Sequence, residues 1–230
     1  MLQTPGGVTA SAAQKAAEAI PRMGAEMASL PEGDLAGKAG FVAAARRFAT
    51  SWWHGGARII ASMIDLNQPV PGFSLPDLAG GLYRLGAFRG RIVIVNFWSA
   101  ECPHSERSDR LLREDCARWG EEVIWLTVAA NRNESAEAVR KAAETRHLPR
   151  VLLDAECRVA DLFGAQTTPH VFVLDRQGIL RYRGAVDNVA FRQRQPTQFY
   201  LRQAVEALLA GQLPQPAETP PFGCTLVREI

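Results

Sequence analysis

The chain has 230 residues, of which 47% are hydrophobic and 22% charged, and its formal net charge is +2. This composition is typical of a globular protein with one sizeable core and an appendage. The small net charge gives no reason to expect a nucleic-acid partner, and no apolar stretch is long enough to span a bilayer. The four cysteines are too few for a disulfide scaffold and form no C-x-x-C pair, so the sequence predicts no metal site and no cofactor.

The first 62 residues differ from the rest of the chain. Residues 1–40 are rich in small side chains, so we expect them to be poorly ordered, with a fluctuating helix around Ala12–Ile20. An amphipathic stripe that includes Trp and Arg follows over Phe41–Met63. We interpret this stripe as a helix that docks on the domain or on a second subunit as a dimer contact, with a membrane-surface contact as the alternative. The compact domain is expected over residues 63–230.

Strands and helices alternate along this domain. The expected elements are, in chain order, a strand near Leu82–Leu85, a buried strand at Arg91–Trp98, a helix at Pro103–Trp119, a buried strand at Glu121–Ala130, a helix capped near Ser135 that runs to Thr145, a strand at Val151–Asp154, a short helix at Arg158–Gly164, a β-hairpin at His170–Gly184 and a helix at Pro196–Leu209. A Pro-rich tail, which we expect to be mobile, ends the chain. This order predicts an α/β fold with a central mixed sheet flanked by helices.

Cys102 is placed where a buried strand gives way to a helix. The strand at 91–98 is rich in β-branched residues, and Pro103 suits the first turn of the helix. Free backbone N–H groups and the positive end of the helix dipole stabilise a thiolate at such a position. We therefore predict that Cys102 is a nucleophile and the most acidic of the four cysteines.

The other cysteines differ in what they can offer Cys102. Cys116 lies about 21 Å further along the same helix, beyond disulfide reach, and is expected in the core. Cys157 precedes a short helix and is given no redox role. Cys224 lies in the Pro-rich and Gly-rich tail, which could carry it to Cys102.

Three segments in order resemble the thioredoxin-fold redoxins. This superfamily includes the thioredoxin-like thiol–disulfide reductases and the alkyl hydroperoxide reductase/thiol-specific antioxidant group. The segments are IVNFWSAECPHSER at 94–107, FGAQTTPHVFVLDRQGILRYRG at 163–184 and YLRQAVEALLAGQLPQPAETPPFGCTLV at 200–227. The resemblance covers about Leu66–Val227 and implies a thioredoxin-like fold.

The resemblance implies roles for particular residues. Cys102 would be the nucleophile, and its resolving partner would be either Cys224, in a tail similar to that of a redoxin subgroup, or an external thiol. Pro169 would follow a cis bond beside Cys102 and present the backbone of Thr168 to an extended substrate. His104 would help to stabilise the thiolate, as the histidine of the CPHC motif does in disulfide-forming oxidoreductases.

The chain also departs from the family patterns. Ser105 stands where the dithiol motif has its second cysteine, so a local C-x-x-C disulfide is excluded. Glu101 stands where many relatives carry Trp. In the peroxidase pattern, Ser99 occupies the hydroxyl position three residues before Cys102, but Val95 stands where a proline is expected.

These observations support three hypotheses. The first is a thiol-dependent oxidoreductase that attacks disulfides or oxidised sulfur, and the second is a peroxidase that works through a cysteine sulfenic acid. The third is a non-catalytic module that binds extended peptides. The expected partners are a protein or small-molecule thiol, disulfide or peroxide substrate and an external thiol reductant. Without a recognisable signal peptide, a cytoplasmic location is expected.

Overall fold

A computed structural model describes residues 63–228; residues 1–62 and 229–230 lie outside this range. The helix expected around Ala12–Ile20 and all but the last residue of the stripe over Phe41–Met63 fall outside it. The proposed dimer or membrane contact therefore stays a prediction. None of the helices within the described range is long and apolar enough to cross a membrane.

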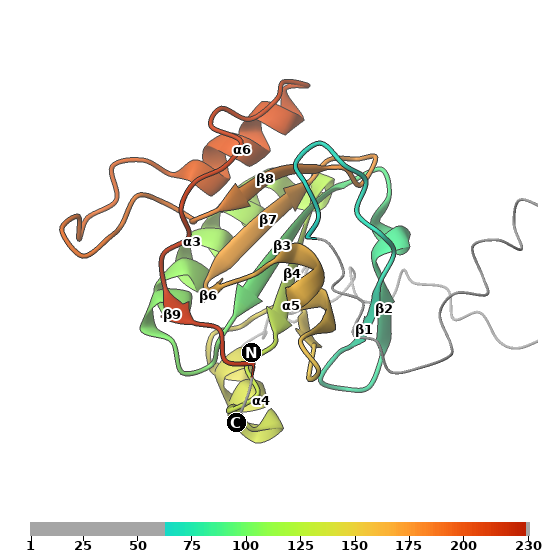
Figure 1. The fold of residues 1–230 in the computed structure, drawn as a ribbon, viewed down its shortest axis with the longest axis vertical. Coiled ribbons are helices and arrows are strands. Elements are labelled where there is room, and N and C mark those ends of the chain that lie inside the picture. The colour runs from blue at the N-terminus through green and yellow to red at the C-terminus, as the bar shows by residue number, and fades with distance from the viewer. Residues whose placement is uncertain (1–62, 229–230) are drawn as a thin grey trace, which may run out of the picture. The chain divides into compact units, whose positions relative to one another are not determined.

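A mixed sheet of five strands forms the centre of the domain, with the strand order β5-β4-β3-β7-β8 (Figure 1). The strands are β3 (Ile92–Trp98), β4 (Val123–Ala129), β5 (Val151–Leu153), β7 (His170–Leu174) and β8 (Leu180–Gly184). Strand β3 pairs in parallel with β4 and antiparallel with β7, and β4 pairs in parallel with β5. The predicted mixed sheet and the β7–β8 hairpin are confirmed.

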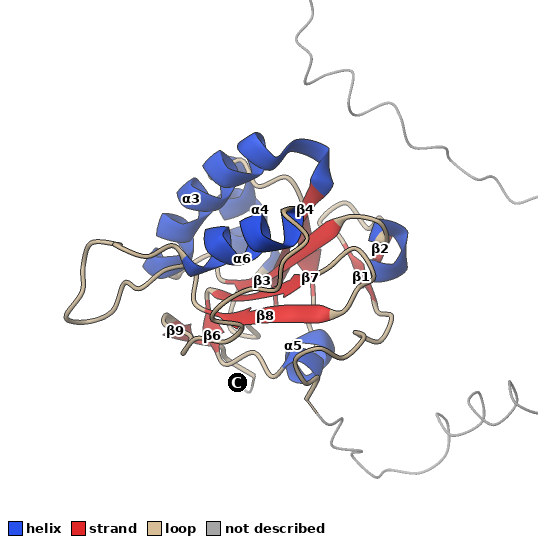
Figure 2. Cartoon of the chain, turned by 90° about the horizontal axis from the view of Figure 1, so that it is seen from above, coloured by secondary structure: helices blue, strands red, loops and turns tan. Residues whose placement is uncertain are grey.

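Helices cover both faces of this sheet (Figure 2). They are α3 (Pro103–Trp119), α4 (Ala136–Thr145), α5 (Arg158–Phe163) and α6 (Tyr200–Leu209), with short 3-10 turns η1 (Leu85–Phe88) and η2 (Gly120–Glu122). Helices α3, α4 and α6 lie on one face, and α5 lies on the other. The domain thus has the helix–sheet–helix layers expected of the α/β class.

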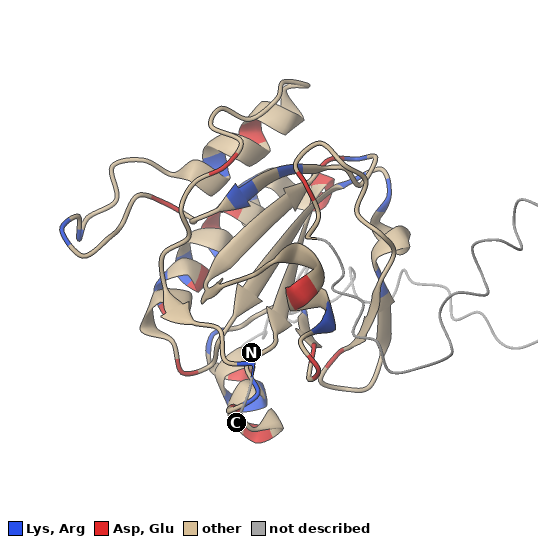
Figure 3. Cartoon of the chain, viewed as in Figure 1, with Lys and Arg blue, Asp and Glu red and all other residues tan. Residues whose placement is uncertain are grey.

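The core follows from the uniformly apolar central strands. Every residue of β3 and β4 is buried. Successive side chains point to opposite faces, so Ile92 and Ile94 pack with the side of α3 and α6, while Val93 and Val95 pack with the side of α5. The strands β3, β4 and β7 carry no Lys, Arg, Asp or Glu, whereas the helices, the loops and the edge strand β8 do (Figure 3).

Helix α6 begins later than its sequence pattern indicates. We expected it from Pro196, but its first residue is Tyr200. The side-chain oxygen of Asn188 accepts hydrogen bonds from the N–H groups of Thr197 (2.9 Å) and Gln198 (3.1 Å). These bonds hold the residues before α6 in a loop, because they supply the backbone donors with a partner outside the helix.

Two short strand pairs lie outside the central sheet. Strand β1 (Ser74–Pro76) pairs with β2 (Leu82–Arg84), and β6 (Thr167–Thr168) pairs with β9 (Cys224–Thr225). The second pair corrects the expectation of a mobile tail, because β9 belongs to that tail.

The tail is held in place by contacts that its composition does not reveal. Along the edge strand β8, the N–H of Thr219 donates to the carbonyl of Arg183 at 3.1 Å. The Thr219 hydroxyl lies 2.7 Å from the Tyr182 hydroxyl and accepts from the N–H of Ala185 at 3.0 Å. Because Thr219 is fixed only a few residues before β9, the Pro-rich segment between them acts as a short, stiff connection.

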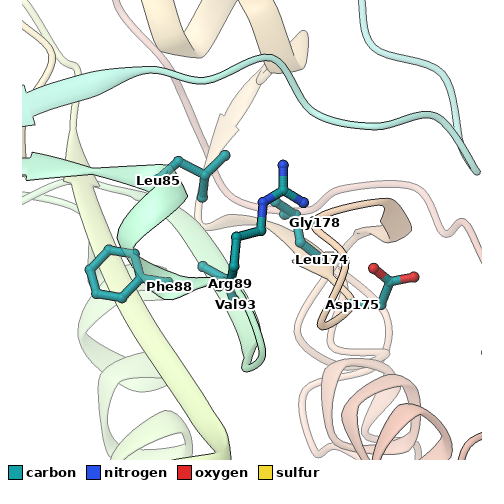
Figure 4. Close-up of a pocket in the computed structure, with 7 residues that line it drawn as sticks. All are labelled: Leu85, Phe88, Arg89, Val93, Leu174, Asp175 and Gly178. Atoms are coloured by element: carbon teal, nitrogen blue, oxygen red, sulfur yellow. The ribbon is translucent and has the colours of Figure 1, made fainter.

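A small pocket lies near the start of β3, and Figure 4 shows seven residues that line it. It holds about 10 Å³ between η1 and the turn from β7 to β8, and its lining includes Arg89, Val93 and Gly178. Val93 is at the start of β3, whereas Cys102 follows the end of that strand. Its size and position exclude this pocket from the site described next.

Candidate active site

Cys102 is the N-cap residue of α3. Its backbone is extended, and its carbonyl accepts the first helical hydrogen bond from the N–H of Glu106 at 3.1 Å. Pro103 is the first residue of the helix, as predicted. The side chain is buried, with only 2% of the residue exposed. The sequence therefore placed the cysteine correctly at the strand-to-helix junction but did not reveal that it is covered.

Two groups from distant parts of the chain cover the Cys102 sulfur. The Thr168 carbonyl oxygen lies 2.9 Å from it, next to a cis bond between Thr168 and Pro169. The sulfur of Cys224 lies 2.6 Å from it, although 122 residues separate the two cysteines. Both cysteines are free thiols. The structure thus brings together Cys102, Thr168, Pro169 and Cys224, all of which were predicted as site residues.

The surroundings of the two thiols move their pKa values in opposite directions. Burial opposes ionisation of Cys102, but hydrogen bonds from the Cys224 thiol and from the N–H groups of Ser105 and Cys224 outweigh it and lower the pKa of Cys102. Burial, the hydrogen bond to Cys102 and repulsion from its charge raise the pKa of Cys224 to about 12. Cys102 is therefore the more acidic thiol of this pair, and Cys224 holds its proton more firmly.

The other two cysteines lie in surroundings that keep them protonated. Burial raises the pKa of Cys116 to about 12, and the residue packs against the core beneath α3. Burial also raises the pKa of Cys157, whose thiol donates to the Ala130 carbonyl at 3.0 Å. Cys102 is thus the one cysteine of the four whose surroundings favour the thiolate, as its position at the helix start predicted.

A carboxylate that the sequence did not point to holds the loop before Cys102. Glu134 accepts hydrogen bonds from the N–H groups of Ala100 and Glu101, both at 3.1 Å, and from the hydroxyl of Ser99. Ser99 is thus buried against Glu134, and its hydroxyl is committed to that carboxylate. A signal for Glu134 did exist, because it follows β4, and the loops after the parallel strands β3 and β4 meet at one edge of the sheet.

A guanidinium holds the carbonyl side of the same loop. Arg146 donates to the carbonyl of Ala100 at 2.6 Å and lies over the ring of Trp98, 5.3 Å from its centroid. It also lies 3.4 Å from the carboxylate of Asp109, which accepts from the Trp98 indole N–H at 3.0 Å. Burial raises the pKa of Asp109 to about 6, although Trp98 and Arg146 both lower it. Together with Glu134, these groups fix the backbone that leads into Cys102.

The remaining predicted residues take positions beside the pair. Ser105 is fully buried one turn into α3, and its hydroxyl lies 3.4 Å from the N–H of Ser99. The His104 ring packs edge-to-face on Phe222, with 5.0 Å between centroids. Phe222 stands two residues before Cys224, so His104 contacts the tail, a contact that sequence reasoning missed.

The comparison with known families agrees with this geometry. The model of the AhpC/TSA family matches residues 66–183, slightly more than half of the chain. The chain belongs to the AhpC/TSA family. This confirms the resemblance to redoxins that the residues around Cys102 and Pro169 indicated.

The curated relatives are named for both thiol–disulfide and peroxide chemistry. The chain is 27% identical over 124 residues to the thiol:disulfide interchange protein DsbE of Vibrio cholerae, which covers 53% of the chain and 66% of the relative. It is 28% identical over 116 residues to the thiol-disulfide oxidoreductase ResA of Geobacillus thermodenitrificans, and this match covers 50% of the chain and 66% of the relative. It is 28% identical over 137 residues to the chloroplastic peroxiredoxin Q of Oryza sativa, and this match covers 54% of the chain and 61% of the relative. The match spans less than two thirds of the length of each relative.

Solved structures share the fold. An uncharacterised conserved protein of Geobacillus kaustophilus matches with a TM-score of 0.64 at 24% identity, over 73% of this chain and 94% of that one. A hypothetical protein of Sinorhizobium meliloti matches with a TM-score of 0.63 at 28% identity, over 72% and 95%. A Neisseria meningitidis protein assigned as a thioredoxin matches with a TM-score of 0.51 at 24% identity, over 64% and 92%. The predicted thioredoxin-like fold is confirmed.

Proposed function

We propose that this protein is a thiol–disulfide oxidoreductase whose redox pair is Cys102 and Cys224. The observation that carries this proposal is the 2.6 Å separation of the two sulfurs. It gives Cys102 a resolving thiol although Ser105 occupies the position of a local one. A disulfide between the two sulfurs requires only a small further approach.

The opposite pKa shifts of the two cysteines support a reaction order in which Cys102 attacks the substrate first and Cys224 resolves the mixed disulfide. The Cys102 thiolate attacks one sulfur of a substrate disulfide, and the other substrate sulfur leaves as a thiolate. Cys224 then gives up its proton to a departing thiolate and attacks the Cys102 sulfur of the mixed disulfide. The reduced substrate leaves, and a Cys102–Cys224 disulfide remains. Two external thiols regenerate the protein by becoming one disulfide, so electrons and protons balance.

The first attack requires the tail to move. Cys102 is 2% exposed because Cys224 and the Thr168 carbonyl lie over its sulfur. A substrate disulfide therefore reaches Cys102 only when β9 leaves β6. When the tail returns, Cys224 comes back to the sulfur that it must attack. The same movement thus admits the substrate and delivers the resolving thiol.

Peroxide reduction is the second candidate function, favoured by the peroxiredoxin relatives. In this reaction the Cys102 thiolate attacks one oxygen of the peroxide, the O–O bond breaks, Cys102 becomes a sulfenic acid, and the rest of the peroxide leaves as water or an alcohol. Cys224 then condenses with the sulfenic acid to form the disulfide and a water molecule. One observation counts against it: the Ser99 hydroxyl, which the peroxidase pattern places near the nucleophile, donates to Glu134.

The test compares Cys224→Ser with Cys116→Ser, a control whose thiol is in the core. After one equivalent of oxidised glutathione, we expect a Cys102–Cys224 cross-linked peptide from the parent and from Cys116→Ser. Cys224→Ser should instead accumulate glutathione on Cys102. The same oxidised species in all three proteins would contradict the proposed pair.

A second measurement separates the two candidate reactions. The parent is assayed for insulin disulfide reduction and for peroxide consumption, each with dithiothreitol as the donor. Turnover of insulin supports the oxidoreductase, whereas consumption of peroxide without insulin turnover favours the second candidate.

A further inference from the structure

The tail segment 222–226 lies on the domain as an extended ligand lies in a binding groove. Its strand β9 pairs antiparallel with β6, with Cys224 opposite Thr168 and Thr225 opposite Thr167. The N–H of Leu226 continues this pairing by donating to the carbonyl of Gln166 at 3.0 Å. Backbone hydrogen bonds of this kind accept any sequence, so the side chains must supply the selectivity.

Three side-chain positions of the segment fit the surface closely. Phe222 packs between the rings of His104, at 5.0 Å, and Phe191, at 5.2 Å. Leu226 is 3% exposed and belongs to the cluster of core side chains beneath α5. Between them, Gly223 passes so close to β6 that a Cβ atom would stand 2.2 Å from the Thr168 carbonyl oxygen.

These fits describe a pattern of an aromatic residue, a glycine, a cysteine, one further residue and a leucine. The aromatic site is open to solvent on one side, since Phe191 is 89% exposed. The glycine position is set by steric exclusion, because the atom that a Cβ would meet belongs to the backbone. The cysteine position places a sulfur 2.6 Å from that of Cys102.

We propose that this surface is a binding site for an extended polypeptide with the pattern Phe-Gly-Cys-x-Leu. The chain's own tail fills the site as a tethered ligand, and the same pattern from another polypeptide binds when the tail is displaced. Thr219 anchors the tail shortly before the segment, so the local concentration of the tethered ligand is high, on the order of millimolar. A free polypeptide must outcompete it.

The test measures binding of a labelled peptide, PFGSTLV, in which serine replaces the cysteine. The full chain carries Gly223→Val, which forces the tail away from Thr168. The matched control is Gly72→Val, because a Cβ at Gly72 meets nothing within 4 Å. We expect Gly223→Val to bind the peptide at least about tenfold more tightly than the parent or Gly72→Val. The peptide PFVSTLV, which carries the same clash, should not bind to any of them.

The readout is independent of the redox function, because the peptide contains no thiol. Equal binding to all three proteins, absence of binding to Gly223→Val, or equal binding of the valine peptide would overturn the proposal. If Gly223→Val loses its cooperative thermal transition, Phe222→Ser is used instead, since it removes the aromatic contact with His104 without adding a clash. The same outcomes then decide the question.

Discussion

Truncating Leu226 should release the tail without unfolding the domain. Leu226 is 3% exposed and contacts the core from the tail, so Leu226→Ala is expected to weaken tail docking by about 2–5 kcal/mol. Even the lower figure multiplies the population of the undocked tail by roughly 30, since each 1.4 kcal/mol is tenfold. Cys102, which the docked tail covers, becomes accessible in the same proportion.

The assay is the rate at which iodoacetamide alkylates Cys102, mapped by mass spectrometry at neutral pH. The parent reacts through the rare undocked state, so Leu226→Ala should react at least roughly thirty times faster. Leu152→Ala is the matched control, because Leu152 lies in the same core cluster and is 0% exposed, but belongs to strand β5 of the main sheet and not to the tail.

The melting temperature separates local release from global loss of stability. Leu152→Ala should lower the melting temperature by about 6–12 °C, from roughly 3 kcal/mol at 2–4 °C per kcal/mol. Leu226→Ala should lower it by less, because its cost to the stability of the domain cannot exceed the free energy of tail docking. The reasoning is refuted if Leu226→Ala melts as early as Leu152→Ala while Cys102 stays as slow to react as in the parent.

Further predictions concern the pair and the buried titratable groups. Ser105→Cys should add a second disulfide, between Cys102 and the introduced thiol, that competes with Cys224 and should raise insulin reduction several-fold over the parent; an unchanged rate and a single disulfide to Cys224 would contradict this. Burial lowers the pKa of His170 to about 4, so the folded protein loses about 3 kcal/mol of stability as pH falls from 6.5 to about 4, and His170→Gln should abolish this loss in urea titrations. Burial raises the pKa of Asp109 to about 6, so protonation of this carboxyl adds about 3 kcal/mol to the stability of the folded protein as pH falls from about 6 to 3.8. Asp109→Asn removes this gain and should therefore make the overall loss of stability in acid steeper. The assigned burial effects are refuted if His170→Gln still loses this stability between pH 6.5 and about 4, or if Asp109→Asn loses stability in acid less steeply than the parent.

The features that the sequence predicted correctly are those that depend on residues adjacent to one another in the chain. The apolar run of β3 and the proline after Cys102 predicted the strand and the helix start, because each follows from a few adjacent residues. The boundaries of α3 were predicted residue for residue for the same reason. The acidity of the thiol follows only in part from such neighbours, because the distant Cys224 also lowers the pKa of Cys102.

The partner of the thiol was harder to place. Cys224 was a candidate only through a resemblance, and its tail was expected to be mobile because prolines and glycines flank it. Such residues exclude a helix but not a two-residue strand held by distant groups. The bond between Thr219 and Tyr182 spans 37 positions, and that between Ser99 and Glu134 spans 35. No local pattern encodes either one.

Because the resolving thiol belongs to the tail, the redox state of the Cys102–Cys224 pair determines whether another polypeptide can reach the edge of β6. A Cys102–Cys224 disulfide would fix β9 across β6, whereas the reduced pair leaves the tail held by noncovalent contacts, among them the β6–β9 hydrogen bonds and the burial of Leu226. Any polypeptide that binds β6 must therefore bind the reduced protein more tightly than the oxidised one. By linkage, the same polypeptide must make the Cys102–Cys224 disulfide easier to reduce, by the same free energy. A dithiol confined to one helical turn has no such coupling, because closing it leaves the neighbouring strand edge as open as before.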